Sequence, residues 1–288
     1  MSLIPQLIVN GIIAGSVYAL IALGFNLIYG VSKFFNLAHG VVAAVGAYIV
    51  LYLAKILGLN IYLALTLGVV SAAAVGLILE KTVYLPLRKR KASSMVVLVA
   101  SLGASIVIQS VIAMIFTSQF QSLSYFFSNQ PIYEIFGGTM TMIQLVTFIS
   151  CVVIFLVLAL ILKKTLFGQA VRAISDDEEV SKIVGINTNR IIGLVFLIGS
   201  AISGLGGILV AFDTGLEPIM GFNLLLKGVI ASIIGGVGNI YGAILGAFML
   251  GLVENFGIWK ISGEWKDPIA FLLLIIFLIF RPKGIISG

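Results

Sequence analysis

The sequence predicts an all-α membrane protein: a polytopic bundle of about eight transmembrane helices, one of them broken at a glycine-rich point, with a short helix outside the membrane. Hydrophobic residues make up 60% of the chain and charged residues 10%, and the mean hydropathy is +1.20. A soluble domain carries about 25% charged residues, because its surface faces water. The length suits one membrane domain, residues 1–288, of about eight spans at about 20 residues each.

Long apolar runs place the individual spans. Lys33 is the first basic residue, so the first run lacks the start of a secretory signal and is expected to be a retained span. The motifs Gly11-Ile-Ile-Ala-Gly15 and Gly242-Ala-Ile-Leu-Gly246 predict close helix packing, because small residues let two backbones approach. The last run is short, and its helix is expected to reach back toward Trp265. The predicted spans lie near residues 5–29, 41–58, 61–79, 95–116, 142–162, 191–212, 224–256 and 268–280.

The seventh run, residues 224–256, is too long for a single span. The stretch GGVGNIYG at 235–242 divides it into two short segments, which gives nine apolar segments when both halves are counted. Irregular backbone is tolerated at membrane depth only inside protein or beside water. The glycine-rich break is therefore a candidate lining of a pathway as well as a packing point.

Lysine and arginine predict the orientation, because cytoplasmic loops are enriched in them. With the basic loops inside, the N-terminus lies outside and the C-terminus inside, and residues 117–141, which lack Lys and Arg, face outward. The aromatic stretch 120–138 is then either a lid at the membrane interface or a contact for an outside partner. Lys227 fits poorly: either its half-span starts later or it faces a polar cavity. The basic residues that set the orientation are Lys81, Arg88, Lys89, Arg90, Lys91, Lys163, Lys164, Arg172, Lys182, Arg190, Arg281 and Lys283.

The residues that several kinds of catalytic or metal site require are absent from the sequence. No Gly-Lys pair exists, so the chain has no P-loop, and His39 is the only histidine, so two-histidine metal sites are excluded. The net charge of +6 resides in loops beside the spans, which favours membrane lipid over nucleic acid as a partner. Binding of Mg²⁺ and a diphosphate by Asp176–Glu179 would require a second acidic cluster, and the other carboxylates are scattered. We therefore expect a non-enzymatic protein with no cofactor of its own.

The acidic run Asp176–Glu179 stands out in so apolar a chain. Ser175 and Glu178 have the spacing of a capping box, and Gly185 is a typical residue after a helix end. These signals predict a short helix from Asp176 to Val184, whose apolar residues Val180, Ile183 and Val184 share one face. A solvated loop, a metal site and a docking helix for a soluble partner are the three interpretations.

Several stretches of the chain resemble a known family. Gly168, Arg172, Ala173, Asp176, Gly185 and Ile186 resemble the cytoplasmic loop of ABC-importer permeases. Four other stretches are similar to the permeases of high-affinity branched-chain amino acid importers of the LivH type, and the likeness runs over nearly the whole chain. These stretches are Gly15–Val31, Asn36–Gly40, Gly235–Ala247 and Arg281–Ile285.

The resemblance implies a transport subunit in the plasma (inner) membrane of a prokaryote. Its implied partners are a second homologous permease, two ABC ATPases that use ATP and Mg²⁺, and an extracytoplasmic binding protein. The implied substrate is a branched-chain amino acid, and urea, a short amide or another hydrophobic amino acid are the alternatives within the family. In a different class, the chain would be an autonomous secondary carrier or channel. Few ionisable residues lie on the spans, which argues against a carrier, and no ionisable cluster is expected there.

The resemblance also assigns residues. Arg172–Ile186 would be the coupling helix that enters a groove on an ATPase, and its acidic side would suit a groove rich in Lys or Arg. His39 is either a buried histidine beside a helix start capped by Asn36 or part of a functional turn. The implied coupling residues are Gly168, Arg172, Ala173, Asp176, Asp177, Glu178, Glu179, Gly185 and Ile186. The implied pathway or gate residues are Asn36, His39, Gly40, Gly235, Gly236, Gly238 and Asn239.

Overall fold

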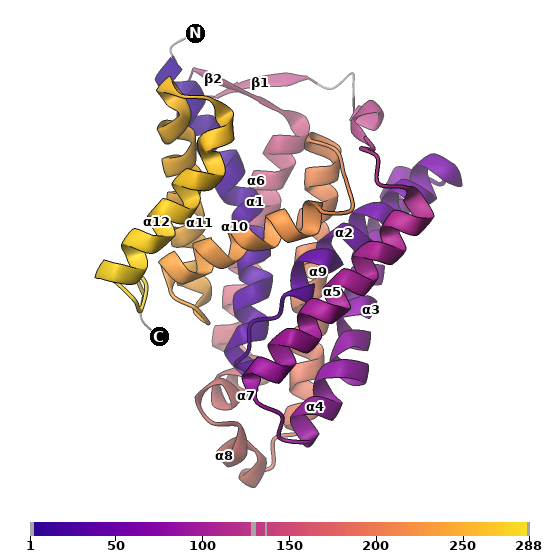
Figure 1. The fold of residues 1–288 in the computed structure, drawn as a ribbon, viewed down its shortest axis with the longest axis vertical. Coiled ribbons are helices and arrows are strands. Elements are labelled where there is room, and N and C mark those ends of the chain that lie inside the picture. The colour runs from indigo at the N-terminus through magenta and orange to yellow at the C-terminus, as the bar shows by residue number, and fades with distance from the viewer. Residues whose placement is uncertain (1–2, 128–130, 136, 287–288) are drawn as a thin grey trace.

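The computed structural model describes residues 3–127, 131–135 and 137–286, and within them the chain forms a helical bundle (Figure 1). Among the residues that the structure describes, seven helical segments are long and apolar enough to cross a membrane, and α10 and α12 are shorter apolar helices. This confirms the predicted all-α polytopic bundle. The helices are α1 (Leu3–Ser32), α2 (Ala38–Val50), α3 (Ile61–Leu79), α4 (Leu85–Lys89), α5 (Ser94–Phe116), α6 (Met142–Lys164), α7 (Leu166–Asp176), α8 (Glu178–Ile183), α9 (Thr188–Asp213), α10 (Met220–Gly235), α11 (Ile240–Gly257) and α12 (Lys266–Phe280).

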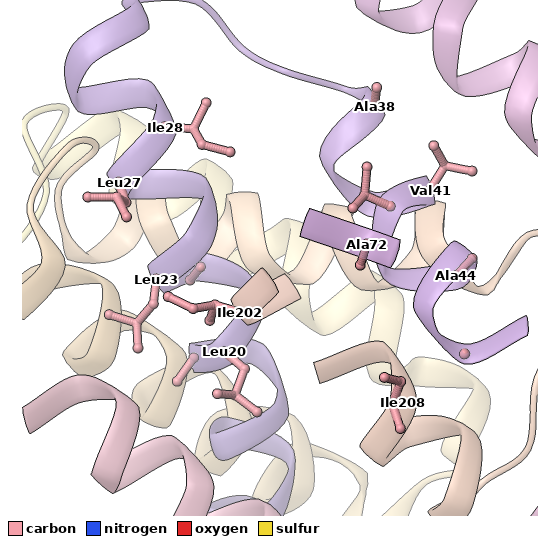
Figure 2. Close-up of a cluster of buried hydrophobic side chains, with 14 of the residues drawn as sticks. Leu20, Leu23, Leu27, Ile28, Ala38, Val41, Ala44, Ala72, Ile202 and Ile208 are labelled. Carbon is pink, nitrogen blue, oxygen red and sulfur yellow. The ribbon is translucent and has the colours of Figure 1, made fainter. Parts of the chain in front are cut away.

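Helix α1 is the centre of the bundle. It packs against α6, α9, α10 and α11, and its residues from Ala19 to Ile28 are buried. Leu20, Leu23, Leu27 and Ile28 meet side chains from α2, α3 and α9 in a continuous apolar core (Figure 2). The outer helices α5 and α6 expose most of their apolar side chains, which is the pattern of a surface that faces lipid.

Glycines allow the closest helix contacts, as the two small-residue motifs predict. A Cβ added at Gly251 of α11 would lie 2.5 Å from the backbone nitrogen of Gly15 in α1. One added at Gly246 would lie 2.7 Å from the backbone nitrogen of Gly235 in α10. Because both contacts involve backbone atoms, only glycine permits these helices to approach so closely.

The broken seventh span is confirmed. Helix α10 ends at Gly235 and α11 begins at Ile240, and between them Gly236 and Gly238 adopt φ angles of 120° and 86°. The Asn239 side chain caps α11 by accepting hydrogen bonds from the backbone nitrogens of Tyr241 and Gly242. Glycine readily adopts these positive φ angles, which end α10. The chain therefore changes direction here, and α11 begins at the cap that Asn239 provides.

The segment after α12 closes this break. The backbone nitrogens of Ile285 and Ile286 donate to the carbonyls of Ile234 and Gly235, each at 2.9 Å. These carbonyls belong to the last turn of α10, which has no helical partner for them. A side chain at Gly236 would collide with the Ile286 carbonyl, so the contact depends on glycine.

Other boundaries differ from the predicted ones in part. The third span continues past Leu79 through a π-helical turn (Glu80–Tyr84) into α4, because the sequence from Thr82 to Leu87 is apolar enough to extend it. A second π-helical turn (Leu51–Ile56) extends α2. Helix α12 begins at Lys266, which confirms the expected extension toward Trp265.

A small β-structure was not predicted. Strands β1 (Ile132–Ile135) and β2 (Gly138–Thr141) pair antiparallel, with Ile132 opposite Thr141 and Ile135 opposite Gly138. Short 3₁₀ segments lie at Ser124–Phe127, Ile258–Lys260 and Gly263–Trp265. The strand pair covers the N-terminal end of α1, opposite to the end where α7 and α8 lie (Figure 1). Residues 128–130 and 136 of the aromatic stretch lie outside the described residues.

Candidate functional site

The acidic run lies in a pair of helices, α7 and α8, and not in the single helix predicted from 176 to 184. Asp176 ends α7, and Asp177 has extended backbone angles that break the two helices apart. The predicted capping box is therefore wrong, since Ser175 lies inside α7. The reason is local: the Asp177 carboxylate accepts from the backbone nitrogens of Glu179 (2.8 Å) and Val180 (3.0 Å), and aspartate caps helices as well as serine does.

The end of α8 agrees with the prediction. Gly185 follows it with a φ of 89°, the left-handed conformation that commonly ends helices. The three apolar residues of α8 and its end are exposed, with relative accessibilities of 54% for Val180, 83% for Ile183 and 69% for Val184. An exposed apolar face of this kind is typical of surfaces that contact another macromolecule.

Gly168 and Arg172 fix α7 against the end of α6. A side chain at Gly168 would collide with the carbonyls of Ile161 and Leu162, so glycine is required at this sharp turn. The Arg172 guanidinium donates to the Leu162 carbonyl, which lies in the last turn of α6. Thr165 caps α7 by accepting from the Gly168 nitrogen. The orientation of α7 is therefore set by α6.

Glu178 connects α8 to the rest of the bundle. Its carboxylate lies 2.8 Å from the Lys182 ammonium and 3.9 Å from the Arg88 guanidinium, and it accepts a hydrogen bond from the Thr188 hydroxyl. Arg88 also binds the buried Glu80 carboxylate at 2.9 Å. Glu178 is thus engaged within the chain, whereas Asp176, Asp177 and Glu179 are exposed.

A cavity of about 360 Å³, here called the α7-side cavity, brings two of the predicted sets together. It lies between α1, the end of α6, α7 and the α10–α11 break. Arg172 from the predicted coupling residues and Gly238 and Asn239 from the predicted gate residues line it, with Asn26 of α1. Asn26 accepts from the Gly238 nitrogen and donates to the Ser232 hydroxyl, so it holds the break against α1.

The other predicted gate residues lie elsewhere. Asn36 accepts hydrogen bonds from the Ala38 nitrogen (3.1 Å) and the Tyr84 hydroxyl (2.9 Å) at the start of α2. His39 is buried, with its Nε2 3.3 Å from the Ile21 carbonyl. Gly40 packs backbone to backbone against Gly221 of α10. These residues surround the junction of α2 with α1 and α10 and do not line the α7-side cavity.

The expectation of no ionisable cluster on the spans is wrong. The Lys227 ammonium lies 2.6 Å from the Glu254 carboxylate and 2.7 Å from that of Asp267. The Tyr18 hydroxyl donates to the second oxygen of Glu254 at 2.7 Å. These residues come from α10, α11, α12 and α1, so no local spacing in the sequence could reveal them. The signal that was available was Lys227 itself, because a cation inside an apolar segment requires a partner.

The fold defines a class: a polytopic membrane protein, with a bundle of apolar helices long enough to cross a membrane and a helix pair at one end. A comparison with family models matches residues 7–278 to the branched-chain amino acid transport system permease component. The chain belongs to that family.

Curated relatives agree over nearly the full length. The high-affinity branched-chain amino acid transport system permease protein BraD of Pseudomonas aeruginosa is 32% identical, with 98% of this chain and 95% of the relative covered. LivH of Escherichia coli K12 is 33% identical with the same coverage, and a probable LivH of Methanocaldococcus jannaschii is 29% identical over 97% and 92%. No solved structure matches the chain.

Proposed function

We propose that this chain is a membrane permease subunit of an ABC importer for branched-chain amino acids. The observation that supports the proposal is the family match over residues 7–278, together with relatives named as such permeases over 95% of their length. The chain lacks a P-loop, so transport would draw on ATP hydrolysed by separate ATPases. Urea or short amides remain the alternative substrates within the same architecture.

The partners follow from the same architecture: a second homologous permease, two ATPases and an extracytoplasmic binding protein. The exposed face of Val180, Ile183 and Val184 is the surface that would enter an ATPase groove. A force on α8 would pass to the bundle through Glu178, because Arg88 connects it to the third span and Thr188 connects it to α9. Asp176, Asp177 and Glu179, which are exposed, are the acidic residues available to a basic groove.

The orientation remains the one predicted from charge. Arg88, Lys163 and Arg172 lie around α4, the end of α6 and α7, which share one end of the bundle, and the strand pair lies at the other end (Figure 1). The positive-inside preference then places the α7–α8 end in the cytoplasm and the N-terminus outside, in a prokaryotic plasma membrane.

Reconstitution tests the proposal. Proteoliposomes that hold both permeases and both ATPases should accumulate leucine only with ATP inside and the binding protein outside. Omitting either the ATPases or the binding protein should abolish uptake. Leucine uptake by liposomes that contain this chain alone would overturn the proposal in favour of an autonomous carrier. Titration of the binding protein with leucine, isoleucine, valine and urea selects among the substrates.

A further inference from the structure

A second cavity, of about 340 Å³, lies near the strand-pair end of the bundle. It is here called the hairpin-side cavity, after the antiparallel pair of β1 and β2. Its walls come from the first half of α1, the start of α6, the end of α9, and α10 to α12. Apolar side chains form one part of the wall, namely Ile13, Val17, Val210 and Leu224. Such a volume and such a lining are those of a small-molecule site.

Two charges of opposite sign line the same cavity. Asp213 at the end of α9 and Lys266 at the start of α12 are both half-buried. In the described part of the chain neither of them forms an ion pair. The Asp213 carboxylate accepts one hydrogen bond, from the Gln144 amide at 3.1 Å. A carboxylate and an ammonium that are partly removed from water without counter-charges gain most from a ligand that supplies both.

The neighbouring ion pairs limit which charges of the cavity remain available to a ligand. Lys227 faces two carboxylates, Glu254 and Asp267, so it offers no further positive charge to the cavity, and the surplus negative charge resides on Asp267, which is largely exposed to solvent. Tyr18, which lines the cavity, directs its hydroxyl to Glu254. The charge available to a ligand is therefore one carboxylate and one ammonium. A net anion or cation would leave one of them unpaired, whereas a zwitterion satisfies both.

The two cavities lie at different positions along α1. Asn10, Ile13 and Val17 line the hairpin-side cavity, and Asn26 and Gly30 line the α7-side cavity. Between the two sets, the side chains from Ala19 to Leu23 are fully buried. The two cavities thus lie at opposite ends of the same helix and are separated by packed core. With the orientation proposed above, the hairpin-side cavity is the one that a substrate from outside would reach first.

We infer that the hairpin-side cavity binds a zwitterionic aliphatic amino acid. Asp213 receives the α-ammonium group, Lys266 receives the α-carboxylate, and the wall of Ile13, Val17, Val210 and Leu224 receives the branched side chain. The inference rests on the proposed function and deepens it, because it places a substrate site within the permease itself.

Cysteine protection tests the site in the complete importer held in lipid nanodiscs without the binding protein. Val17→Cys places a thiol in the cavity wall, and the native Cys151 is buried. Leucine should slow maleimide labelling of Val17→Cys several-fold. It should leave the labelling of Glu134→Cys, on the exposed face of β1, unchanged. Leucinamide and 4-methylpentanoate, which lack one charge each, should need at least about tenfold higher concentrations, since a hydrogen bond to a charged group contributes about 1.5–3 kcal/mol.

Charge variants assign the two ends of the ligand. Asp213→Asn should raise the leucine concentration that gives half-maximal protection about tenfold, and it should bring that concentration closer to the one needed for 4-methylpentanoate. Lys266→Gln should also raise the leucine concentration about tenfold, and it should bring it closer to the one needed for leucinamide. Glu264→Gln and Lys260→Gln are matched controls, because both residues are exposed near the start of α12, outside the cavity wall. Equal thermal stability and subunit assembly of all four variants separate a binding effect from misfolding.

Two outcomes would overturn the inference. One is the absence of leucine protection at Val17→Cys in an importer that takes up leucine when ATP and the binding protein are present, and the proposed function then stands. The other is protection that Asp213→Asn and Lys266→Gln leave unchanged. An importer that fails to take up any branched-chain amino acid under the same conditions would instead contradict the proposed function.

Discussion

Replacing Lys227 by methionine would remove the cation from a fully buried carboxylate. Glu254 has a relative accessibility of 0%, and its two oxygens contact Lys227 at 2.6 Å and Tyr18 at 2.7 Å. Removal of one partner from a buried ion pair destabilises a protein by about 3–5 kcal/mol, because the remaining charge is uncompensated. The second partner, Asp267, is largely exposed, and its contact with Lys227 contributes about 0–1 kcal/mol. Because the Asp267 contribution is small, the total loss is expected to be about 3–5 kcal/mol.

Thermal unfolding of the purified importer measures this loss. A change of 1 kcal/mol shifts Tm by about 2–4 °C in domains of about 150–250 residues, so Lys227→Met should lower Tm by roughly 6–20 °C. The double variant Lys227→Met with Glu254→Gln should recover most of that loss, since a neutral amide can still contact Tyr18 and no buried charge remains. Lys81→Met, at an exposed position on the third span, should change stability by less than about 0.5 kcal/mol.

The recovery is the decisive measurement. If Lys227→Met were as stable as the wild type, the ion pair would not carry the energy that its burial indicates. If the double variant were no more stable than Lys227→Met, the loss would come from packing of the lysine stem and not from the orphaned charge.

Three further predictions concern the opposite end of the bundle and the broken span. Gly236→Ala should destabilise the chain by about 1–3 kcal/mol in thermal unfolding, because φ is 120° and the Ile286 carbonyl lies against it; Gly103→Ala, which meets open space, should not. Glu178→Gln should lower leucine uptake per ATP hydrolysed in proteoliposomes several-fold while the importer still assembles, because the contact between residue 178 and Arg88 loses its charge while Arg88 keeps its pairing with the buried Glu80. Ile183→Glu should weaken ATPase binding at least about tenfold in a pull-down titration, whereas Leu166→Glu, exposed on α7, should not.

Each of these has a contrary result. Equal stability of the two glycine variants would show that the break tolerates a side chain. Uptake by Glu178→Gln at the wild-type ratio to ATP hydrolysis would remove the role of the Arg88–Glu178 contact, and Glu264→Gln, at an exposed position near the start of α12, serves as its control. Charge reversal of both Glu178 and Glu179 should also impair uptake, and full uptake would refute a role for the acidic side of α8. Wild-type ATPase binding by Ile183→Glu would exclude the apolar face of α8 as the contact.

The spans were predictable because hydropathy acts over long windows. A run of about 20 apolar residues is long enough to cross a membrane as a helix. The glycines of residues 235–238 indicated the break between α10 and α11. The ends of the spans were less predictable. The third span continues past Leu79 into a π-helical turn, and no single residue in the sequence indicates such a turn. The short strands β1 and β2 were missed because strand pairing depends on two segments meeting rather than on either one.

The candidate site was predictable only where its determinants are local. Gly185 ends α8 as expected, but Ser175 and Asp177 both fit a helix cap, and the continuation of α7 through Asp176 decided between them. The joining of Arg172 with Gly238 in one cavity, and of Asp213 with Lys266 in another, depends on how distant helices pack. Spacing along the chain carries no information about such contacts.

The hydrogen bonds from Ile285 and Ile286 to the end of α10 change how the glycine-rich break can move. A break between two half-helices usually serves as a hinge, where a few residues absorb a change in backbone angles. Here the segment after α12 is hydrogen-bonded to the last turn of α10, so bending of the chain at Gly236 would first have to detach that segment. The tail ties α12 to the end of α10, so a conformational change that leaves these bonds intact would move α10 and α12 together.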